Sequence, residues 1–323
     1  MGAIQKMISG LADTLALMLG AACALAALAA HGGRFSPRLD VLTHFAPFWL
    51  AGALIVLLYG LLLAPAALRS TILMLGGLGA VAAAALILPE LMRPIRRPVA
   101  ANAPHQLKLI QLNAWNENVD VEGTADWITR QAPDLVLVEE CEAPMRAALV
   151  KRGFRYTRGM VRTGVFSRAA PAPAPFQIPD GDWRLLPSFA RDSFDLPAGG
   201  FSIIATHVTW PTRSHQEAEI KALKALVDRY DKTRLILVGD FNLTPWSFNL
   251  QRIDRTFGLE RRDRAMFSWP ARPFMGGLLR SPVAFLPIDH IYAGSAWRTV
   301  SIERGPRLGS DHYPVVVVLA LQD

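Results

Sequence analysis

Three long apolar runs occupy the first 90 residues of the chain. They cover residues 14–30, 41–64 and 71–89, and His44 is the only residue in them that can carry a charge. A helix needs about 20 apolar residues to cross the hydrocarbon core of a bilayer, and the second run fits this length best. Three runs in succession argue against a cleaved signal peptide. The pattern therefore predicts three transmembrane helices, and the alternative is a buried bundle of soluble helices.

After residue 105 the pattern changes to short strands separated by helices. Alternating or continuous apolar residues predict strands at 107–115, 134–138, 201–208, 234–238, 287–292 and 313–321, and helical spacing marks 121–131 and 214–230. Thr244 followed by Pro245 predicts the start of a further helix, with Thr as the N-cap. The many strands favour an α/β sandwich of two packed sheets covered by helices over a single parallel sheet.

The stretch between these two regions is typical of a linker beside a membrane, because it is rich in proline, arginine and alanine. The predicted domains are three transmembrane helices in residues 1–90, a juxtamembrane linker at 91–104 and a folded domain at 105–323.

The net charge of +7 is divided unevenly between these regions. Residues 1–100 hold seven Lys or Arg and three Asp or Glu, which leaves the rest of the chain close to balance. A domain so near neutrality is a poor non-specific binder of nucleic acid, because neutralised phosphates supply most of that affinity. The charge therefore counts against a DNA substrate. Cys23 and Cys141 lie far apart and have no zinc-type spacing, so we expect neither a disulfide nor a zinc site.

Polar residues that can bind a metal ion or transfer a proton collect at or near the ends of the predicted strands, and Asp311 and His312 directly precede the last one. They are Asn113, Glu139, Glu140, His207, Asp240, Asn242, Asp289, His290, Asp311 and His312. Acidic side chains are almost never buried unless they are paired or bound to a metal. Packing alone does not explain such residues at five separate strand ends, so we expect an active site there.

The motifs at these strand ends resemble those of the endonuclease/exonuclease/phosphatase superfamily, which includes deoxyribonucleases, abasic-site endonucleases, inositol-phosphate phosphatases and sphingomyelinases. The motifs are QLNAWN, PDLVLVEEC, ATHV, VGDFNLTPWS, PIDHIY and GSDHYPV, in the family's order over residues 107–321. The combination of GDFN followed by SDH is specific. The resemblance implies a four-layered α/β sandwich with the active site at one edge, in a membrane-anchored, bacterial-type member.

The resemblance also implies metal-binding residues. Glu140 resembles the family's metal-binding carboxylate, Asn113 the Asn that contacts metal or phosphate, and Asp311 a second carboxylate on the metal side. Glu139 stands where the family usually has Gln, and it could alter the charge around the metal or point into solvent. Carboxylate and amide oxygens suit a hard cation, so the expected cofactor is Mg²⁺ or Mn²⁺, as one ion or two.

Five further residues would carry catalytic roles by the same resemblance. Asp240 resembles the residue that orients or deprotonates the attacking water, and Asn242 its companion that positions phosphate oxygens. His312 resembles the histidine that stabilises the transition state or exchanges protons with it, and Asp289 the carboxylate that orients this histidine. His207 resembles a histidine near the leaving group or phosphate.

The resulting prediction is an integral-membrane, metal-dependent phosphoesterase that hydrolyses a phosphate ester or pyrophosphate by metal-assisted attack of water. Its expected partners are the lipid bilayer and a phosphate-containing substrate, with a lipid-linked phosphate favoured over nucleic acid and no obligate protein partner. The alternatives are a DNA endonuclease or exonuclease and a catalytically inactive binding module.

Other polar residues have more ordinary interpretations. We expect His290 to be structural. Arg261, Arg262 and Arg264 form a basic patch that fits either anionic lipid headgroups or a solvated loop.

The predicted location is a cell inner or plasma membrane. Lys and Arg near the three helices set their orientation. A cytoplasmic folded domain puts five basic residues on the inside and Lys6 and Arg69 outside; the five are Arg34, Arg38, Arg93, Arg96 and Arg97. The count favours this orientation.

Overall fold

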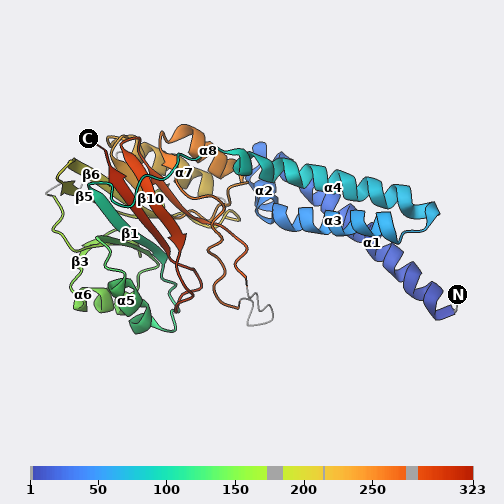
Figure 1. Cartoon of the computed structure of the whole chain (residues 1–323), viewed down its shortest axis with the longest axis horizontal. Coiled ribbons are helices and arrows are strands. Elements are labelled where there is room, and N and C mark those ends of the chain that lie inside the picture. The colour runs from blue at the N-terminus through green and yellow to red at the C-terminus, as the bar shows by residue number, and fades with distance from the viewer. Residues whose placement is uncertain (1–2, 173–184, 214, 274–282, 323) are drawn as a thin grey trace. The chain divides into compact units, whose positions relative to one another are not determined.

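The computed structural model describes residues 3–172, 185–213, 215–273 and 283–322 and divides into two compact units (Figure 1). The N-terminal unit comprises Met1–Arg93 together with Thr244–Gln251, which we call the inserted segment. The sandwich unit comprises Pro94–Leu243 and Arg252–Asp323. The division predicted from the sequence into anchor, linker and folded domain stays a prediction, and it did not anticipate the inserted segment.

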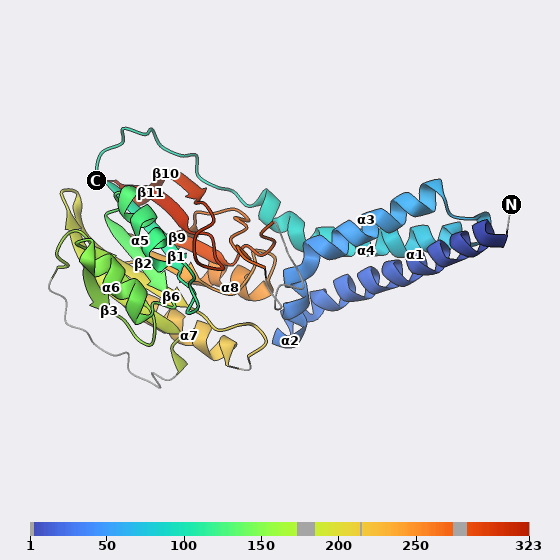
Figure 2. The same ribbon diagram turned by 90° about the horizontal axis from the view of Figure 1, so that it is seen from below.

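Three long helices, α1 (Ala3–Ala30), α3 (Ala46–Leu62) and α4 (Ala66–Met92), run alongside one another in the N-terminal unit (Figures 1 and 2). The short helix α2 (Pro37–Asp40) and two 3₁₀ turns connect α1 to α3. All three spans are long and apolar enough to cross a membrane, which confirms the prediction of three apolar helices.

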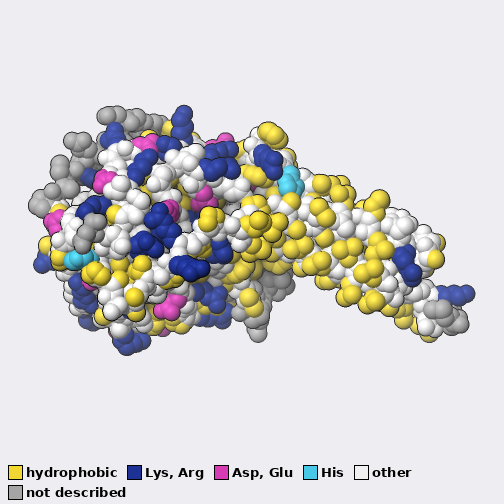
Figure 3. Space-filling view, turned by 45° about the horizontal axis from the view of Figure 1, so that its top comes forward, with side chains coloured by type: hydrophobic (Ala, Val, Ile, Leu, Met, Phe, Trp, Pro, Cys, Tyr) yellow, Lys and Arg dark blue, Asp and Glu magenta, His cyan; other side chains and the backbone are white. Residues whose placement is uncertain are grey.

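The surface and the interior of this helical unit differ in side-chain size. Small residues such as Ala27, Ala53 and Ala83 are fully buried between the helices. Large apolar side chains such as Leu25 and Ile55 are exposed, and hydrophobic side chains cover the visible face of these helices in Figure 3. Close packing through small residues with large apolar residues outside is the arrangement of helices in lipid, where leucine gains little by facing inward.

The sandwich unit contains two mixed sheets. The first has the strand order β10-β11-β1-β2-β4-β3 and the second β5-β6-β7-β9-β8. The strands of the first sheet are β1 (Gln106–Asn113), β2 (Leu135–Glu139), β3 (Arg155–Arg158), β4 (Gly164–Ser167), β10 (Trp297–Arg304) and β11 (Val315–Leu321). Those of the second are β5 (Ser188–Leu196), β6 (Gly199–His207), β7 (Leu235–Asp240), β8 (Glu260–Arg261) and β9 (Asp289–Ala293).

Alternation along β1 explains how the layers are packed. Leu109 belongs to the core between the two sheets, whereas its neighbour Ile110 faces the helices α5 (Val121–Arg130) and α6 (Ala143–Lys151). Successive side chains of a strand point to opposite faces, so a sheet covered on both sides reads as a nearly continuous apolar run. Helix α7 (Gln216–Val227) buries Ile220, Leu223 and Leu226. The predicted four-layered sandwich is confirmed.

The predicted helix start at Thr244 is wrong. Residues 244–247 form a turn in which the Ser247 N–H donates to the Thr244 carbonyl oxygen at 2.9 Å. Helix α8 (Phe248–Thr256) begins only after this turn.

Candidate active site

The pairing of strands brings the polar strand ends to one edge of the sandwich. Asn113 at the end of β1 is in register with Glu139 at the end of the parallel strand β2. In the second sheet, Asp240 at the end of β7 is in register with His207 on one side and with Asp289 on the other. β1 and β2 are parallel, as are β6 and β7, and Asp289 begins the antiparallel strand β9, so within each sheet backbone hydrogen bonding makes these residues neighbours.

Asn113 joins the two sheets through its side-chain amide. Its Nδ2 donates to Glu140 Oε1 at 3.2 Å and to Asp240 Oδ2 at 3.1 Å. Glu140 Oε2 also accepts from the Asn116 N–H at 3.2 Å. Glu140 has a backbone φ of +49°, a left-handed conformation that residues other than glycine adopt rarely. The turn directs the Glu140 side chain away from the strand in which Glu139 is buried.

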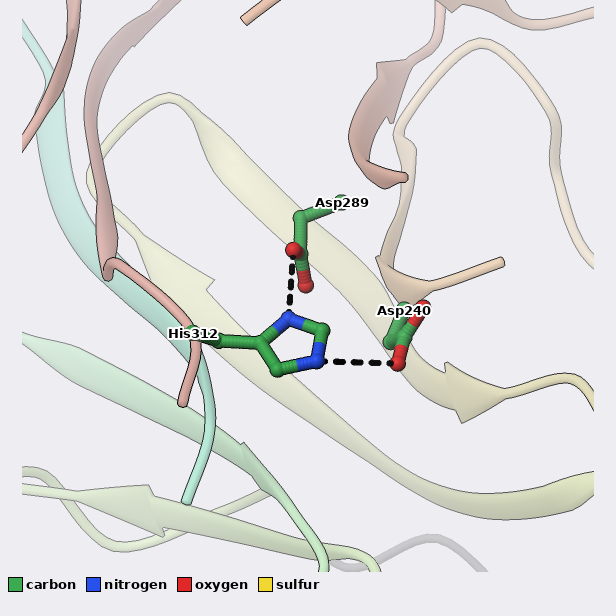
Figure 4. Close-up of side chains that lie close together, drawn as sticks. All are labelled: Asp240, Asp289 and His312. Atoms are coloured by element: carbon green, nitrogen blue, oxygen red, sulfur yellow. Dashed lines mark hydrogen bonds and ion pairs between the residues drawn. The ribbon is translucent and has the colours of Figure 1, made fainter. Parts of the chain in front are cut away.

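Asp289 and His312 form a buried ion pair at the centre of the site. Asp289 Oδ2 lies 2.8 Å from His312 Nδ1, and the other ring nitrogen, Nε2, lies 3.7 Å from Asp240 Oδ2 (Figure 4). The His312 backbone is fixed by Ser310, whose Oγ accepts from the His312 N–H at 3.0 Å and donates to the Asn113 carbonyl oxygen at 2.6 Å. Both ring nitrogens therefore face carboxylates.

Asp240 is surrounded by groups of both signs. Its Oδ2 lies 3.6 Å from His207 Nε2, and its Oδ1 accepts from the Asn242 N–H at 2.9 Å. Asn242 also donates from Nδ2 to the Val208 carbonyl oxygen at 2.8 Å, and its φ of +50° is again left-handed. Asn242 thus holds the turn that follows Asp240.

The surroundings of Asp240 and His312 raise the pKa values of both groups. Burial, together with the charge of Asp289, raises the pKa of Asp240 to about 6, although His312 and His207 act in the opposite direction. Burial disfavours a charged imidazole, but the charge and hydrogen bond of Asp289, reinforced by Asp240, raise the pKa of His312 to about 10. The site therefore holds a cationic ring beside a carboxylate that titrates near neutrality.

Gln111 is a site residue that the sequence reasoning missed. Its Nε2 donates to Asp289 Oδ1 at 2.6 Å and to Glu139 Oε2 at 3.0 Å. The available signal was the period of two along β1, which puts Gln111 on the same face as Asn113. Glu139 is fully buried beside it, so the expectation that Glu139 could point into solvent is wrong.

His290, Arg261 and Arg262 are structural. His290 Nδ1 lies 2.8 Å from Asp263 Oδ2, and its Nε2 lies 2.8 Å from the Leu243 carbonyl oxygen. Arg261 pairs with Asp263 at 3.4 Å. The side chains of Arg261 and Arg262 are almost completely buried, so neither a lipid-facing patch nor a solvated loop describes these two residues. Burial raises the pKa of Asp263. The charges and hydrogen bond of His290, together with Arg261, have the larger and opposite effect, so the pKa lies well below its ordinary value.

Residues 110–312, more than half of the chain, match the model of the endonuclease/exonuclease/phosphatase family. The chain belongs to this family. Members of the endonuclease/exonuclease/phosphatase family are hydrolases that act on phosphoester bonds and in general depend on a divalent metal ion. The predicted enzyme class, hydrolase acting on ester bonds, is thereby confirmed. No curated protein matches the chain.

Solved structures of the family share the fold of the sandwich unit. An endonuclease/exonuclease/phosphatase from Beutenbergia cavernae DSM 12333 is 22% identical, with a TM-score of 0.51 over 68% of this chain and 72% of that one. A mannosyl-6-phosphatase from Bacteroides thetaiotaomicron VPI-5482 is 15% identical, with a TM-score of 0.52 over 67% of this chain and all of the other. A humanized D. rerio TDP2 is 14% identical, with a TM-score of 0.51 over 66% of this chain and 98% of the other.

The residues fit the metal ion on which the family depends. Asp311 Oδ2 accepts from Trp269 Nε1 at 3.0 Å, while its Oδ1 is buried and has no hydrogen-bond donor among the described residues. A buried carboxylate oxygen without a donor is costly unless a cation or water binds it. Glu140 adds a partly exposed carboxylate, and Asn113 an amide oxygen.

Asp240, Asp289 and His312 are also close enough together to be considered as metal ligands. Of the two sets, Glu140, Asn113 and Asp311 offer the all-oxygen ligands that suit a hard cation such as Mg²⁺.

The buried Glu139 predicts a stability that depends on pH. Burial and the charge of Asp289 raise the pKa of Glu139 well above its ordinary value of 4.5. The folded protein then binds a proton that the unfolded chain releases, so stability falls as pH rises above this value. Glu139→Gln removes this loss. Its melting temperature should exceed that of the parent protein by a margin that grows from about pH 4.5 to about pH 8.

Thermal unfolding measured across this range checks the expectation. Glu117→Gln, at an exposed position, is the matched control and should show no such trend. A margin for Glu139→Gln that stays constant with pH would mean that Glu139 is ionised in the folded protein.

Proposed function

We propose that the chain is a membrane-anchored, metal-dependent phosphoesterase whose active site is the edge formed by Asn113, Asp240, Asp289 and His312. The observation that carries the proposal is the contact chain from Asp289 through His312 to Asp240, with Asn113 linking Asp240 to Glu140. It puts a cation, a titrating carboxylate and a metal-type carboxylate within one site.

Asp240 acts on the attacking water. Its pKa of about 6 leaves it ionised at neutral pH but basic enough to take a proton, which is the condition for general base catalysis. Asn242 holds the turn that carries Asp240, because its N–H donates to Asp240 Oδ1 and its Nδ2 donates to the Val208 carbonyl oxygen and, at 3.5 Å, to Asp240 Oδ2. Asn242 and Asp240 thus act as one element.

His312 supplies positive charge. With both nitrogens protonated, its Nε2 can donate to an oxygen of the phosphoryl group as negative charge develops there, and Asp289 fixes the ring. His207, partly exposed and 3.6 Å from Asp240, is placed to contact the substrate phosphate or the leaving group. Asp240 and His312 thus have opposite roles, base and cation, because their surroundings shift their pKa values differently.

Glu140, Asn113 and Asp311 would hold the metal ion, Mg²⁺ or Mn²⁺, since oxygen ligands suit a hard cation. When bound, the ion supplies neutralisation of phosphate charge.

A phosphate carried by a lipid is the substrate class that we favour. The three apolar helices keep the enzyme at a bilayer, where tethering makes lipid headgroups an abundant target. The 14 residues predicted as a linker span at most about 50 Å. The region after residue 100 is close to charge balance, which gives little attraction to a polyanionic duplex. A nuclease and an inactive binding module are the alternatives.

The first prediction from this proposed function concerns the catalytic pair. Asp240→Asn, and separately His312→Ala, should lower kcat on a phosphodiester by roughly 10²-fold or more, because each removes an acid–base or charge-stabilising group. His215→Gln, at an exposed position, is the control and should keep the parent rate. Near-normal turnover of both site variants in purified protein would refute the proposal.

The second concerns the metal ion. EDTA should abolish activity, and Mg²⁺ or Mn²⁺ should restore it. Glu140→Gln should raise the metal concentration needed for half-maximal activity, because it removes a charged oxygen ligand. Glu139→Gln is the matched control next to it in the chain and should be much milder. Equal losses in the two variants would show that the two glutamates have been assigned the wrong way round.

The third concerns the substrate. The protein reconstituted in lipid bilayers should release phosphate from a lipid phosphate or pyrophosphate faster than it nicks plasmid DNA at matched phosphate concentration. Efficient nicking without release from the lipids would replace the lipid substrate by a nuclease function. Release from neither, with intact metal binding, would favour the binding module.

The fourth concerns orientation. The five-to-two distribution of Lys and Arg favours a cytoplasmic sandwich unit at a cell inner or plasma membrane. A reporter fused after the last residue should be active only in the cytoplasm, and activity solely on the other side would reverse this topology.

A further inference from the structure

A carboxylate between the first two membrane helices is built around the inserted segment. Asp40 ends helix α2, and its side chain is almost fully buried. Its Oδ1 accepts from the Phe248 N–H at 2.8 Å. Its Oδ2 accepts from Ser247 Oγ at 2.8 Å and from the Asn249 N–H at 3.1 Å. All three donors lie about 200 positions later in the chain, in residues that belong to the N-terminal unit.

These donors form the start of α8. The first N–H groups of a helix have no acceptor inside the helix and carry partial positive charge, so a carboxylate stabilises them. Ser247 is the local cap, because its Oγ accepts from the Asn249 N–H at 3.1 Å. Asp40 adds a second cap from another part of the chain, which fixes where α8 begins.

The packing around Asp40 is close on several sides. A Cβ on Gly33 would lie 2.8 Å from Asp40 Cα and 2.9 Å from a ring carbon of Phe248. Trp246 Nε1 donates to the His44 carbonyl oxygen at 3.2 Å. The inserted segment is therefore held at a defined position within the N-terminal unit by its side chains and its backbone.

The segment is joined directly to the catalytic turn. Thr244 follows Asn242 by two residues, and Asn242 N–H donates to Asp240 Oδ1. Between them, the Leu243 carbonyl oxygen faces Nε2 of His290 at 2.8 Å. The inserted segment begins at Thr244, directly after Leu243. Because no linker residue separates them, a shift of the segment is transmitted along the backbone to Asn242 and Asp240.

We propose that Asp40 is a positioning residue for Asp240, acting through the inserted segment and the backbone that joins this segment to the catalytic turn. This rests on the proposed phosphoesterase function. Displacement of a catalytic group lowers kcat and leaves the affinity for the bound substrate, and so KM, little changed.

The test uses the full-length protein in lipid bilayers with bis(p-nitrophenyl) phosphate as the probe. Asp40→Ala should lower kcat by about 10-fold with little change in KM. The double variant Asp40→Ala/Ser247→Asp should recover most of the lost kcat, because aspartate at the N-cap position replaces the missing carboxylate. Asp40→Asn, which keeps one acceptor for the Phe248 N–H, should show a smaller loss, and it serves if Asp40→Ala fails to fold.

Tyr59→Phe is the matched control. It removes the 2.6 Å hydrogen bond from Tyr59 to Asp13 between α3 and α1 of the same unit and leaves the inserted segment untouched. It should keep the parent kcat. An equal loss in Tyr59→Phe, or an unchanged kcat in Asp40→Ala, overturns the proposal.

Amide hydrogen exchange over residues 240–250 separates this proposal from the proposed function. Asp40→Ala should speed exchange at Asn242 as well as at Phe248 and Asn249. Faster exchange confined to Phe248 and Asn249 would make Asp40 a helix cap only and would contradict the positioning role. If the parent protein hydrolyses no phosphoester, the proposed function fails, while exchange at Asn242 still decides whether Asp40 positions the turn.

Discussion

The ion pair between Asp289 and His312 is the interaction on which the site depends. It joins the start of β9 in the second sheet to the turn before β11 in the first, at 2.8 Å and out of contact with water. Removing two charged groups from water is unfavourable unless their geometry is good and their remaining atoms are satisfied. Gln111 meets this condition by donating to the free oxygen of Asp289. The Asp289–His312 ion pair therefore joins the two sheets at this edge of the sandwich, next to the apolar core.

This pair also determines what Asp240 can do. Asp240 lies in the field of Asp289, which opposes its ionisation, and in the fields of His312 and His207, which favour it. As a result Asp240 has a pKa of about 6, beside the His312 ring, whose pKa is about 10. The same physics extends to Glu139, whose burial beside Asp289 favours the neutral acid. A neutral acid carries no charge that must be compensated, so the site can accommodate the Glu139 carboxyl group buried beside Asp289.

The sequence predicted what local patterns and motifs encode. Apolar runs marked β1, β2, β6, β7, β9 and β11, and the polar residues after them marked the edge where the site forms. It did not predict the short, partly exposed strand β3, whose side chains alternate weakly. Nor did it predict Gln111 as a partner of Asp289, because that contact joins positions 178 residues apart. The buried Arg261 looked like a surface residue because its partners, Asp254 and Asp263, cannot be inferred from composition.

The most direct test of this account is the protonation state of His312, which NMR of protein labelled with ¹⁵N-histidine reports. Loss of the signal in His312→Gln assigns the ring. The account predicts that at about pH 8 both ring nitrogens of His312 carry protons, with Nδ1–H in a strong hydrogen bond to Asp289. A neutral ring at that pH, with one nitrogen unprotonated, would contradict the claim that a buried imidazolium organises the site.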